Sequence, residues 1–131
     1  MTPDGELVLG VDLATAAVRV LAVDVTTGAV AASADMPLPA PTSPRPGELE
    51  QQPAHVAAVR TVLRRLTGEL GPRAGAVRAL SVTATSGSVL AADAAGTPTG
   101  PVLLYADQRG APQAARISAA TGQRVAARWP R

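Results

Sequence analysis

Cysteine is absent from the 131 residues, which excludes a disulfide framework, a thiolate metal site and a cysteine nucleophile. Phenylalanine is absent as well, and Tyr105 and Trp129 are the only aromatic residues. A hydrophobic core therefore has to be built from valine, leucine and alanine. With 47% hydrophobic and 17% charged residues, the chain is not of the disordered type, and its length suits one compact domain rather than two of ordinary size.

Lysine is also missing: all 12 basic residues are arginine, so the isoelectric point is about 10.4 although the net charge is only +2. A high isoelectric point is typical of nucleic-acid-binding domains. Here the arginines are scattered and aromatic residues that could stack on bases are almost lacking. We therefore expect no nucleic-acid partner.

Long apolar runs are lacking too. No segment approaches the roughly 20 apolar residues that cross a membrane, and Asp4 and Glu6 precede the first short apolar run where a secretory signal would carry basic residues. We expect a cytoplasmic protein without a membrane partner. The single histidine, His55, is predicted to face solvent, and one histidine alone makes neither a metal site nor a catalytic triad.

Three apolar segments at the start, residues 6–13, 17–25 and 29–36, are separated by short turns and predict an antiparallel meander. In the second segment Val18 and Val20 fall on one face and Arg19 and Leu21 on the other. Five prolines between Pro37 and Pro46 then exclude helix and central strand. This stretch reads either as an ordered surface crossing or as a loose loop.

A helix is predicted over residues 53–70, with Pro53 in its first turn and Gly71 at its end. Its apolar stripe comprises Val56, Val59, Leu63, Leu66 and Leu70.

After the helix, the pattern predicts strands over residues 77–84, 88–93 and 101–105 and a weak helix over 111–120. The crossover helix should place the strand 77–84 parallel to the first strand. This order indicates an α/β fold with a mixed, five-stranded sheet and flanking helices, of the ribonuclease H-like type that also underlies actin-like ATPases.

The first place where chemistry could sit follows Asp12, at the end of the first strand. The tight turn after it could present backbone N–H groups to phosphate, Asp12 could hold Mg²⁺ through water, and Thr15 and Arg19 could add a hydroxyl and a positive charge. By spacing alone, an ordinary hairpin with an exposed aspartate is the commoner explanation.

Two further candidates lie downstream. The residues 83–88, Thr-Ala-Thr-Ser-Gly-Ser, combine hydroxyls with little bulk, as a sugar pocket requires. Asp107 and Arg109 could bind hydroxyls and charge. Each has a plain alternative, a serine–glycine turn in the first case and a surface ion pair in the second.

Taken in order, these segments resemble the start of the FGGY-type carbohydrate kinases. That family has an Asp-x-Gly-Thr-x-x-x-Arg/Lys motif, matched by 12–19, and an Arg-Pro-Gly-Trp-x-Glu-Gln-Asp-Pro segment before a helix, matched by 45–53. A sugar-contacting turn, an Asp-x-x-Gly-x-Pro turn and a Trp/Tyr-x-Asp-x-Arg motif are matched by 81–87, 93–98 and 105–109. The Thr-Ser-Gly-Ser turn is most similar to the ribulose-kinase-like branch.

The resemblance implies phosphoryl transfer from MgATP to a hydroxyl of a sugar such as ribulose or xylulose. It implies that Asp12, Thr15 and Arg19 face the ATP phosphates, with Asp12 also helping to hold Mg²⁺. Ser86 and Gly87 would line the sugar pocket. Asp107 and Arg109 are carried over as substrate-binding residues through the last motif.

Two departures from the family pattern stand out: Ala14 replaces the glycine of the first motif, and Glu48 replaces a tryptophan. A methyl group at position 14 would cost roughly 1–2 kcal/mol if the turn needed a positive φ. By the family pattern, residues 1–131 are an incomplete N-terminal domain ending mid-domain at 128–131. The general-base aspartate and the C-terminal ATP-binding domain would lie beyond it.

We therefore expect the chain alone to be inactive and its exposed apolar surface to favour self-association. Other readings stay open. The chain could be a non-catalytic ribonuclease H-like remnant or binding module, an interpretation that Ala14 favours. An actin- or chaperone-type ATPase would share the first phosphate loop, but 83–88 and 105–109 argue against it.

Overall fold

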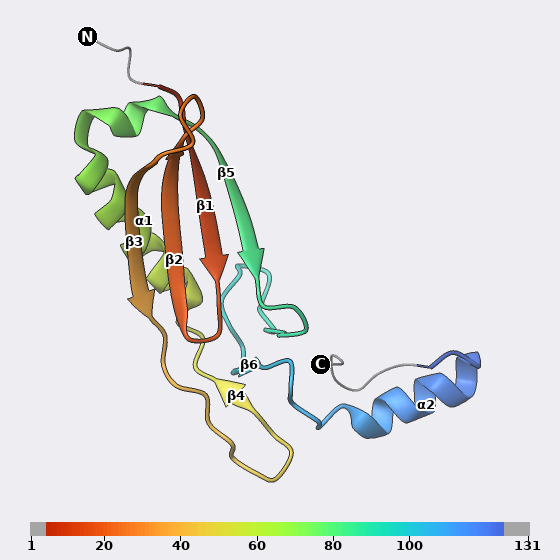
Figure 1. Ribbon diagram of the computed structural model, residues 1–131. Coiled ribbons are helices and arrows are strands. Elements are labelled where there is room, and N and C mark those ends of the chain that lie inside the picture. The colour runs from red at the N-terminus through yellow and green to blue at the C-terminus, as the bar shows by residue number, and fades with distance from the viewer. Residues whose placement is uncertain (1–4, 125–131) are drawn as a thin grey trace. The chain divides into compact units, whose positions relative to one another are not determined.

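The computed structural model describes residues 5–124, and Figure 1 shows the order of their elements. The strands and helices are β1 (Leu7–Leu13), β2 (Ala17–Asp24), β3 (Val30–Pro37), β4 (Glu50–Gln51), α1 (His55–Leu70), the 3₁₀ helix η1 (Gly71–Ala76), β5 (Val77–Ala84), β6 (Val102–Leu103) and α2 (Ala111–Thr121). The expected chain end at 128–131 lies outside the described residues.

The chain divides into two compact units, each assembled from two stretches of sequence. Unit 1 comprises residues up to Leu38 together with Ala54–Ala84, and unit 2 comprises Pro39–Pro53 together with the residues from Thr85 onward. The proline-rich stretch is thus an ordered crossing, since Thr42 and Glu50 form a β-bridge, and most of it belongs to unit 2.

Unit 1 contains a four-stranded sheet in the order β3-β2-β1-β5. β1 pairs antiparallel with β2 and β2 antiparallel with β3, while β1 pairs parallel with β5. The predicted meander and the predicted parallel return after the helix are both confirmed. The described residues place four strands in this sheet rather than the expected five, because the later apolar segments belong to unit 2.

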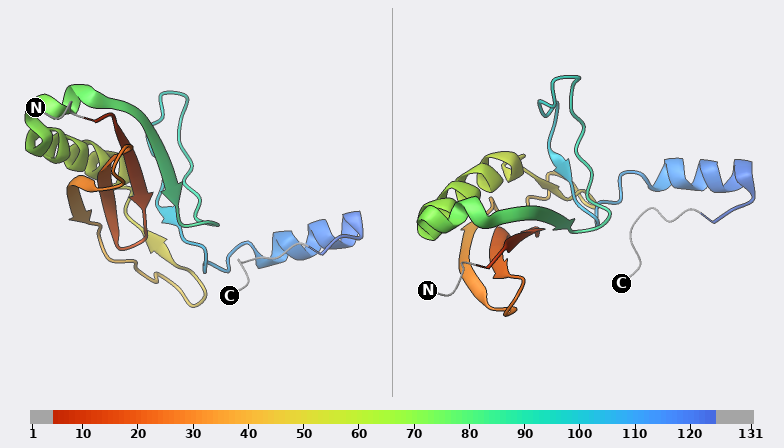
Figure 2. Two further views of the ribbon diagram at one scale, coloured as in Figure 1. Left: turned by 45° about the horizontal axis from the view of Figure 1, so that its top comes forward. Right: turned by 90° about the horizontal axis from the view of Figure 1, so that it is seen from above.

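Helix α1 packs on one face of this sheet, mainly against β2 and β3 (Figure 2). Alternation along β2 puts Val18 and Val20 in the core with no exposed surface, and Leu21 on the other face with 43% exposure. This confirms the predicted two faces of the strand. Burying such a valine contributes about 1.5–3 kcal/mol.

The helix differs from its prediction at its start and in its buried stripe. It begins at His55, so Pro53 lies before it, and His55 is half-buried rather than solvent-facing. Burial lowers the pKa of His55. The buried residues are Ala58, Val62, Leu66 and Leu70. Of the predicted stripe, Leu66 and Leu70 are buried and Val59 and Leu63 pack against the core, whereas Val56 is 60% exposed.

Beyond the end of α1, β5 lies at one edge of the sheet and is largely uncovered. Seven of its eight residues are exposed, including Leu80 at 49% and Val82 at 55%. The cause is the position of α1, which packs over β2 and β3. This strand presents the exposed apolar surface that the sequence led us to expect.

Unit 2 is built around the short antiparallel pair of β4 and β6. The predicted strand 88–93 is wrong as a continuous strand: it makes only the isolated bridges Val89–Leu103 and Ala92–Pro98. Likewise, the predicted strand 101–105 shortens to two residues. The turn around Gly96, with φ of 80°, accounts for this, because it folds the segment back on itself over a few residues. The second predicted helix is confirmed as α2.

Candidate functional site

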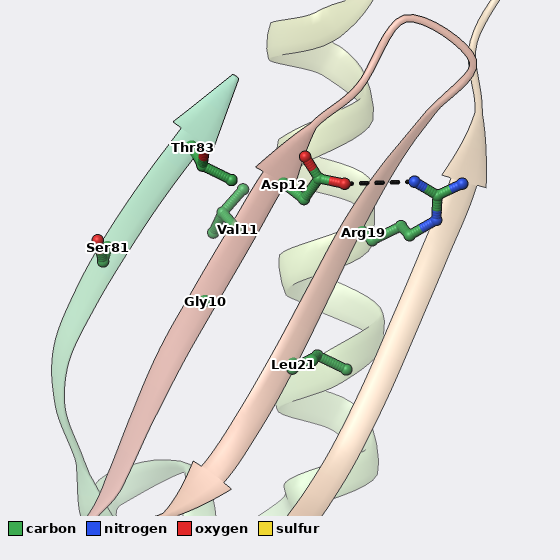
Figure 3. A pocket seen from close by; sticks show the side chains of 7 residues that line it. All are labelled: Gly10, Val11, Asp12, Arg19, Leu21, Ser81 and Thr83. Carbon is green, nitrogen blue, oxygen red and sulfur yellow. Dashed lines mark hydrogen bonds and ion pairs between the residues drawn. The ribbon is translucent and has the colours of Figure 1, made fainter. Parts of the chain in front are cut away.

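The end of β1 and the start of β2 place a carboxylate and a guanidinium side by side. Asp12 and Arg19 are direct partners in the antiparallel register, and Arg19 Nη1 lies 3.3 Å from Asp12 Oδ2. Their side chains are 43% and 54% exposed. Because Val11 and Val18 point into the core, Asp12 and Arg19 stand on the sheet face away from α1 (Figure 3).

The turn between these strands is closed by the backbone N–H of Ala14, which donates to the carbonyl of Ala17 at 3.1 Å. No non-glycine residue among those described has a positive φ, so Ala14 occupies an ordinary backbone region. The strain considered for an alanine at this position is therefore not present. Thr15, in the same turn, is half-buried.

Asp12 and Arg19 border a hollow of about 380 Å³ on this open face of the sheet. The parallel register of β1 and β5 sets Ser81 beside Gly10 and Thr83 beside Asp12. The hollow is lined by Gly10, Val11, Asp12, Arg19, Leu21, Ser81 and Thr83. At Gly10 an added Cβ would meet nothing within 4 Å, so glycine leaves the floor of the hollow flat.

The donor set in this hollow suits a hydrated Mg²⁺ ion bound together with phosphate. Within residues 5–124 there is no group of three or more histidine, cysteine or acidic side chains able to enclose a metal. Mg²⁺ usually keeps several waters and takes one or two carboxylates plus substrate phosphates. Asp12 can supply one carboxylate, and the guanidinium of Arg19 can pair with a phosphate oxygen.

The turn that follows β5 contains Ser86 and Gly87, both exposed. Gly87 has a φ of 81°, a conformation that a residue with a Cβ adopts only at a cost. Ser88, next in the chain, has its hydroxyl oxygen buried with no hydrogen-bond partner in the structure. Exposed hydroxyl and amide groups at Ser86 and Gly87 are able to meet a polyol.

Asp107 is a buried carboxylate, 8% exposed, and it accepts hydrogen bonds from several directions. Its Oδ2 accepts from the backbone N–H of Leu49 at 2.7 Å, and its Oδ1 from that of Arg109 at 2.9 Å. Nε of Arg109 lies 2.9 and 3.0 Å from the two oxygens. The hydrogen bonds from Arg109, more than any other contact, lower the pKa of Asp107 to about 2.

Arg109 joins Asp107 to two glutamates that sequence reasoning did not select. Its Nη2 lies 2.8 Å from Glu50, 2.9 Å from Asp107 and 3.7 Å from Glu48. The hydrogen bonds that Arg109 donates to Asp107 and Glu50 raise its pKa above the usual range. Glu48, noted only as a departure from the family pattern, also lies 3.5 Å from Arg45.

The seven predicted site residues are thus distributed over the two units. Asp12, Thr15 and Arg19 lie together in unit 1. Unit 2 holds the Ser86–Gly87 turn and the Asp107–Arg109 pair. The signal that could have exposed the two glutamates is their spacing at positions 48 and 50, which puts both side chains on one side of an extended segment.

Comparison with known proteins decides the family. The model of the FGGY family of carbohydrate kinases, N-terminal domain, matches residues 7–128. The chain belongs to this family. Among curated proteins it is 35% identical to the xylulose kinase of Streptomyces coelicolor and 34% identical to that of Streptomyces rubiginosus, in each case over 114 residues.

Each match covers 87% of this chain but 22% of the Streptomyces enzyme. The chain therefore spans about a fifth of the length of these relatives.

Solved structures agree with this assignment. A xylulose kinase from Brucella ovis superimposes with a TM-score of 0.77 at 26% identity, covering 89% of this chain and 24% of that one. One from Rhodospirillum rubrum gives 0.75 at 27% identity, covering 88% and 24%. The FGGY chain thus has the fold of the carbohydrate kinases, the actin-like ATPase fold, as predicted. No helix within residues 5–124 is long and apolar enough to span a membrane.

Proposed function

We propose that this FGGY chain supplies the N-terminal part of a kinase that transfers a phosphoryl group from MgATP to a hydroxyl of a pentulose such as xylulose or ribulose. The observation that carries the proposal is the arrangement of Asp12 and Arg19 on the open sheet face beside the hollow. A carboxylate for a hydrated cation and a guanidinium for phosphate stand 3.3 Å apart there.

The chemistry asked of these residues is positioning and charge neutralisation. Phosphoryl transfer depends on holding the phosphates and neutralising the charge that develops on them. Asp12 would hold Mg²⁺, which supplies that neutralisation when bound. Arg19 would leave Asp12 and turn to a phosphate oxygen; because both side chains are about half exposed, this exchange costs little. Thr15 would add a hydroxyl from the turn.

The sugar would meet the turn at Ser86 and Gly87. A hydroxyl and a glycine backbone that admits close approach suit a ligand rich in hydroxyl groups. The xylulose kinases among the relatives support a pentulose as the substrate class.

The general base that takes the proton of the sugar hydroxyl would come from outside these 131 residues, so we propose that the chain alone does not phosphorylate sugar. Xylulose, ribulose and glycerol, each supplied with MgATP, should give no turnover. ATP consumption by the isolated chain that disappears in Asp12→Ala would contradict this part of the proposal.

A domain exchange tests the proposal positively. The 114 residues of the Streptomyces coelicolor enzyme that match this chain would be replaced by the corresponding residues of this chain. We expect xylulose phosphorylation, and a loss of at least about 100-fold in kcat/KM with Asp12→Asn.

The matched control is Asp35→Asn. Asp35 is the partner of Arg19 in the register of β3 and is exposed, so it tests a carboxylate on the other side of the same arginine. Equal losses in the two variants would refute a specific role of Asp12. A domain-exchanged enzyme that folds, binds ATP and leaves xylulose untouched would favour the alternative, a non-catalytic ribonuclease H-like module.

The exposed edge strand suggests that the isolated chain associates with itself. Leu80 and Val82 would pair across two copies along β5, because an unpaired strand edge with apolar side chains is a template for another strand. Sedimentation at increasing concentration should show association that Val82→Lys reduces.

A further inference from the structure

The turn at Ser86 and Gly87 leads directly into a small sheet. The backbone N–H groups of Val89 and Leu103 each donate to the carbonyl of the other residue, both at 2.8 Å. On its other side, Leu103 pairs with Glu50 in the antiparallel register of β4 and β6. The turn is therefore attached to β4 through two ladder contacts.

A second set of contacts closes this small sheet at the far end of β6. The N–H of Leu104 donates to the carbonyl of Leu49 at 3.0 Å, and the N–H of Gln108 donates to that of Gly47 at 2.7 Å. Asp107 adds the hydrogen bond from Leu49 N–H. The segments 47–51 and 102–109 are thus tied together over their whole length.

The carboxylate of Asp107 has no acceptor site left for a substrate. An ionised carboxylate offers about four lone-pair directions. Two backbone N–H groups and the guanidinium of Arg109 use them, and the side chain is only 5% exposed. A sugar hydroxyl could bind Asp107 only by displacing one of these donors and leaving it unpaired.

Arg109 is held with similar firmness. Three carboxylates surround its Nη2, the nearest being Glu50 at 2.8 Å. Both Glu48 and Glu50 have side chains that are 20% exposed or less. An arginine that pairs with acidic residues on two segments joins those segments, and its planar shape fixes their orientation.

We propose that Asp107 and Arg109 are positioning residues that lock β4 against β6 and thereby hold the turn 85–88 in place, and that neither touches the sugar. This inference rests on the proposed function in one respect: the proposed function is what assigns sugar binding to the turn. It replaces the expectation that Asp107 and Arg109 are themselves substrate ligands.

The test uses the whole 131-residue chain without sugar or nucleotide, by amide hydrogen exchange and ¹H–¹⁵N spectra. Asp107→Asn and Arg109→Gln should each speed exchange at Val89 and Leu103 by about tenfold or more, and should shift the resonances of Ser86 and Gly87. Arg109→Lys keeps the charge but not the forked geometry, so it should fall between the wild type and Arg109→Gln.

Two control variants accompany these. Arg45→Gln removes the other arginine beside Glu48; the side chain of Arg45 is 79% exposed. Asp93→Asn alters a carboxylate that accepts from Ala95 and Thr97 within its own loop. Both should leave Gly87 unmoved. Unchanged amide resonances of Val11 and Val20 show that a variant remains folded.

The proposal is overturned if the spectra change at β4 and β6 while Ser86 and Gly87 stay unmoved, because the pair would then support only its own segments. If Asp107→Asn unfolds unit 2, the resonances of Ser86 and Gly87 are compared in Arg109→Lys instead. These measurements are made without substrate. Failure of the domain exchange would therefore contradict the kinase proposal but not the positioning role of Asp107 and Arg109.

Discussion

The two units of this chain are stabilised by different means. In unit 1 the core is a continuous apolar layer in which Leu7, Val18, Val20, Val62 and Leu66 have no exposed surface. Among the described residues of unit 2, the buried apolar ones are Val102, Leu104 and Ala114, and they share the interior with Gln51 and Asp107. The first unit excludes water with a sheet and a helix, whereas the second relies on a buried carboxylate with its donors.

This difference has consequences for how each unit tolerates change. An apolar core loses free energy with every methyl group removed, and pH hardly affects it. A buried ion pair responds to protonation and to the geometry of its partners, and removing one partner leaves a charge without compensation. The predicted site residues follow the same division, since Asp12 lies on the sheet of unit 1 and Gly87 lies in unit 2.

The largest effect should come from the core of unit 1. Leu66→Ala removes a fully buried side chain from α1 and should lower the free energy of unfolding by about 2–5 kcal/mol. Urea denaturation followed by circular dichroism measures it. The control is Val56→Ala on the same helix, 60% exposed, which should change stability by about 0.5 kcal/mol or less. Similar losses in both would mean that α1 does not pack as described.

A smaller effect, confined to unit 2, should appear with pH. The pKa of Asp107 is about 2 in the folded protein and 3.8 ordinarily. Because folding lowers this pKa, the stabilisation is fully present above about pH 4 and is lost as the pH falls through about 2. Amide exchange at Leu49 and Leu103 should therefore accelerate on acidification, and Asp107→Asn should flatten that dependence.

Unit 1 has its own acid-sensitive group, which sharpens the comparison. The pKa of Asp24 is lowered as well, chiefly by the hydrogen bond from the N–H of Thr27. Protonation of Asp24 in acid should therefore destabilise the β2–β3 turn, in the same direction as protonation of Asp107 destabilises unit 2. Asp24→Asn separates the two contributions: acid sensitivity at Leu103 should remain in that variant and disappear in Asp107→Asn. The opposite pattern would contradict the assignment of this acid sensitivity to Asp107.

A still smaller effect is expected at the turn after Asp12. Ala14 has an ordinary backbone conformation, so Ala14→Gly adds chain entropy to the unfolded state and should cost about 0.4–1 kcal/mol. Thermal unfolding of the two proteins measures this. An increase in stability would show that the turn is strained by the methyl group. In the domain-exchanged enzyme, a higher kcat/KM with Ala14→Gly would show that the methyl group obstructs phosphate.

The sequence predicted unit 1 better than unit 2. In unit 1 the inward face of β2 follows from periodicity, because burial on one face imposes a period of two. The antiparallel pairing follows from the short turns and the parallel pairing from the crossover helix. The predicted stripe of α1 was largely right, since Leu66 and Leu70 are buried and Val59 and Leu63 pack against the core, but it included the exposed Val56 and missed Ala58 and Val62. The three- and four-residue spacing allows more than one start for the stripe, and the packing of the helix on the sheet selects which start is buried.

In unit 2 the sequence predicted less. Residues 88–93 were predicted as a strand, but the backbone turns back at Gly96 and only two bridges form. Asp107 and Arg109 were recognised as a pair, yet their partners Glu48 and Glu50 lie more than fifty residues earlier in the chain. The spacing of the two glutamates puts them on one side of an extended segment, but no local pattern connects that segment to Arg109. Their role depends on a fold that had to be known first.

The smallest expected effect on stability belongs to the pair from which the proposed function is argued. Asp12 and Arg19 are about half exposed and lie 3.3 Å apart, so Arg19→Gln should change the free energy of unfolding by less than about 0.5 kcal/mol. The same change in the domain-exchanged enzyme should lower kcat/KM. It should also make kcat/KM depend less on the Mg²⁺–nucleotide, because the phosphate loses the guanidinium of Arg19. Arg60→Gln, on the outer face of α1, is the control for loss of an arginine. A fall in stability of several kcal/mol with Arg19→Gln would mean that the ion pair holds the hairpin together instead of waiting for a ligand.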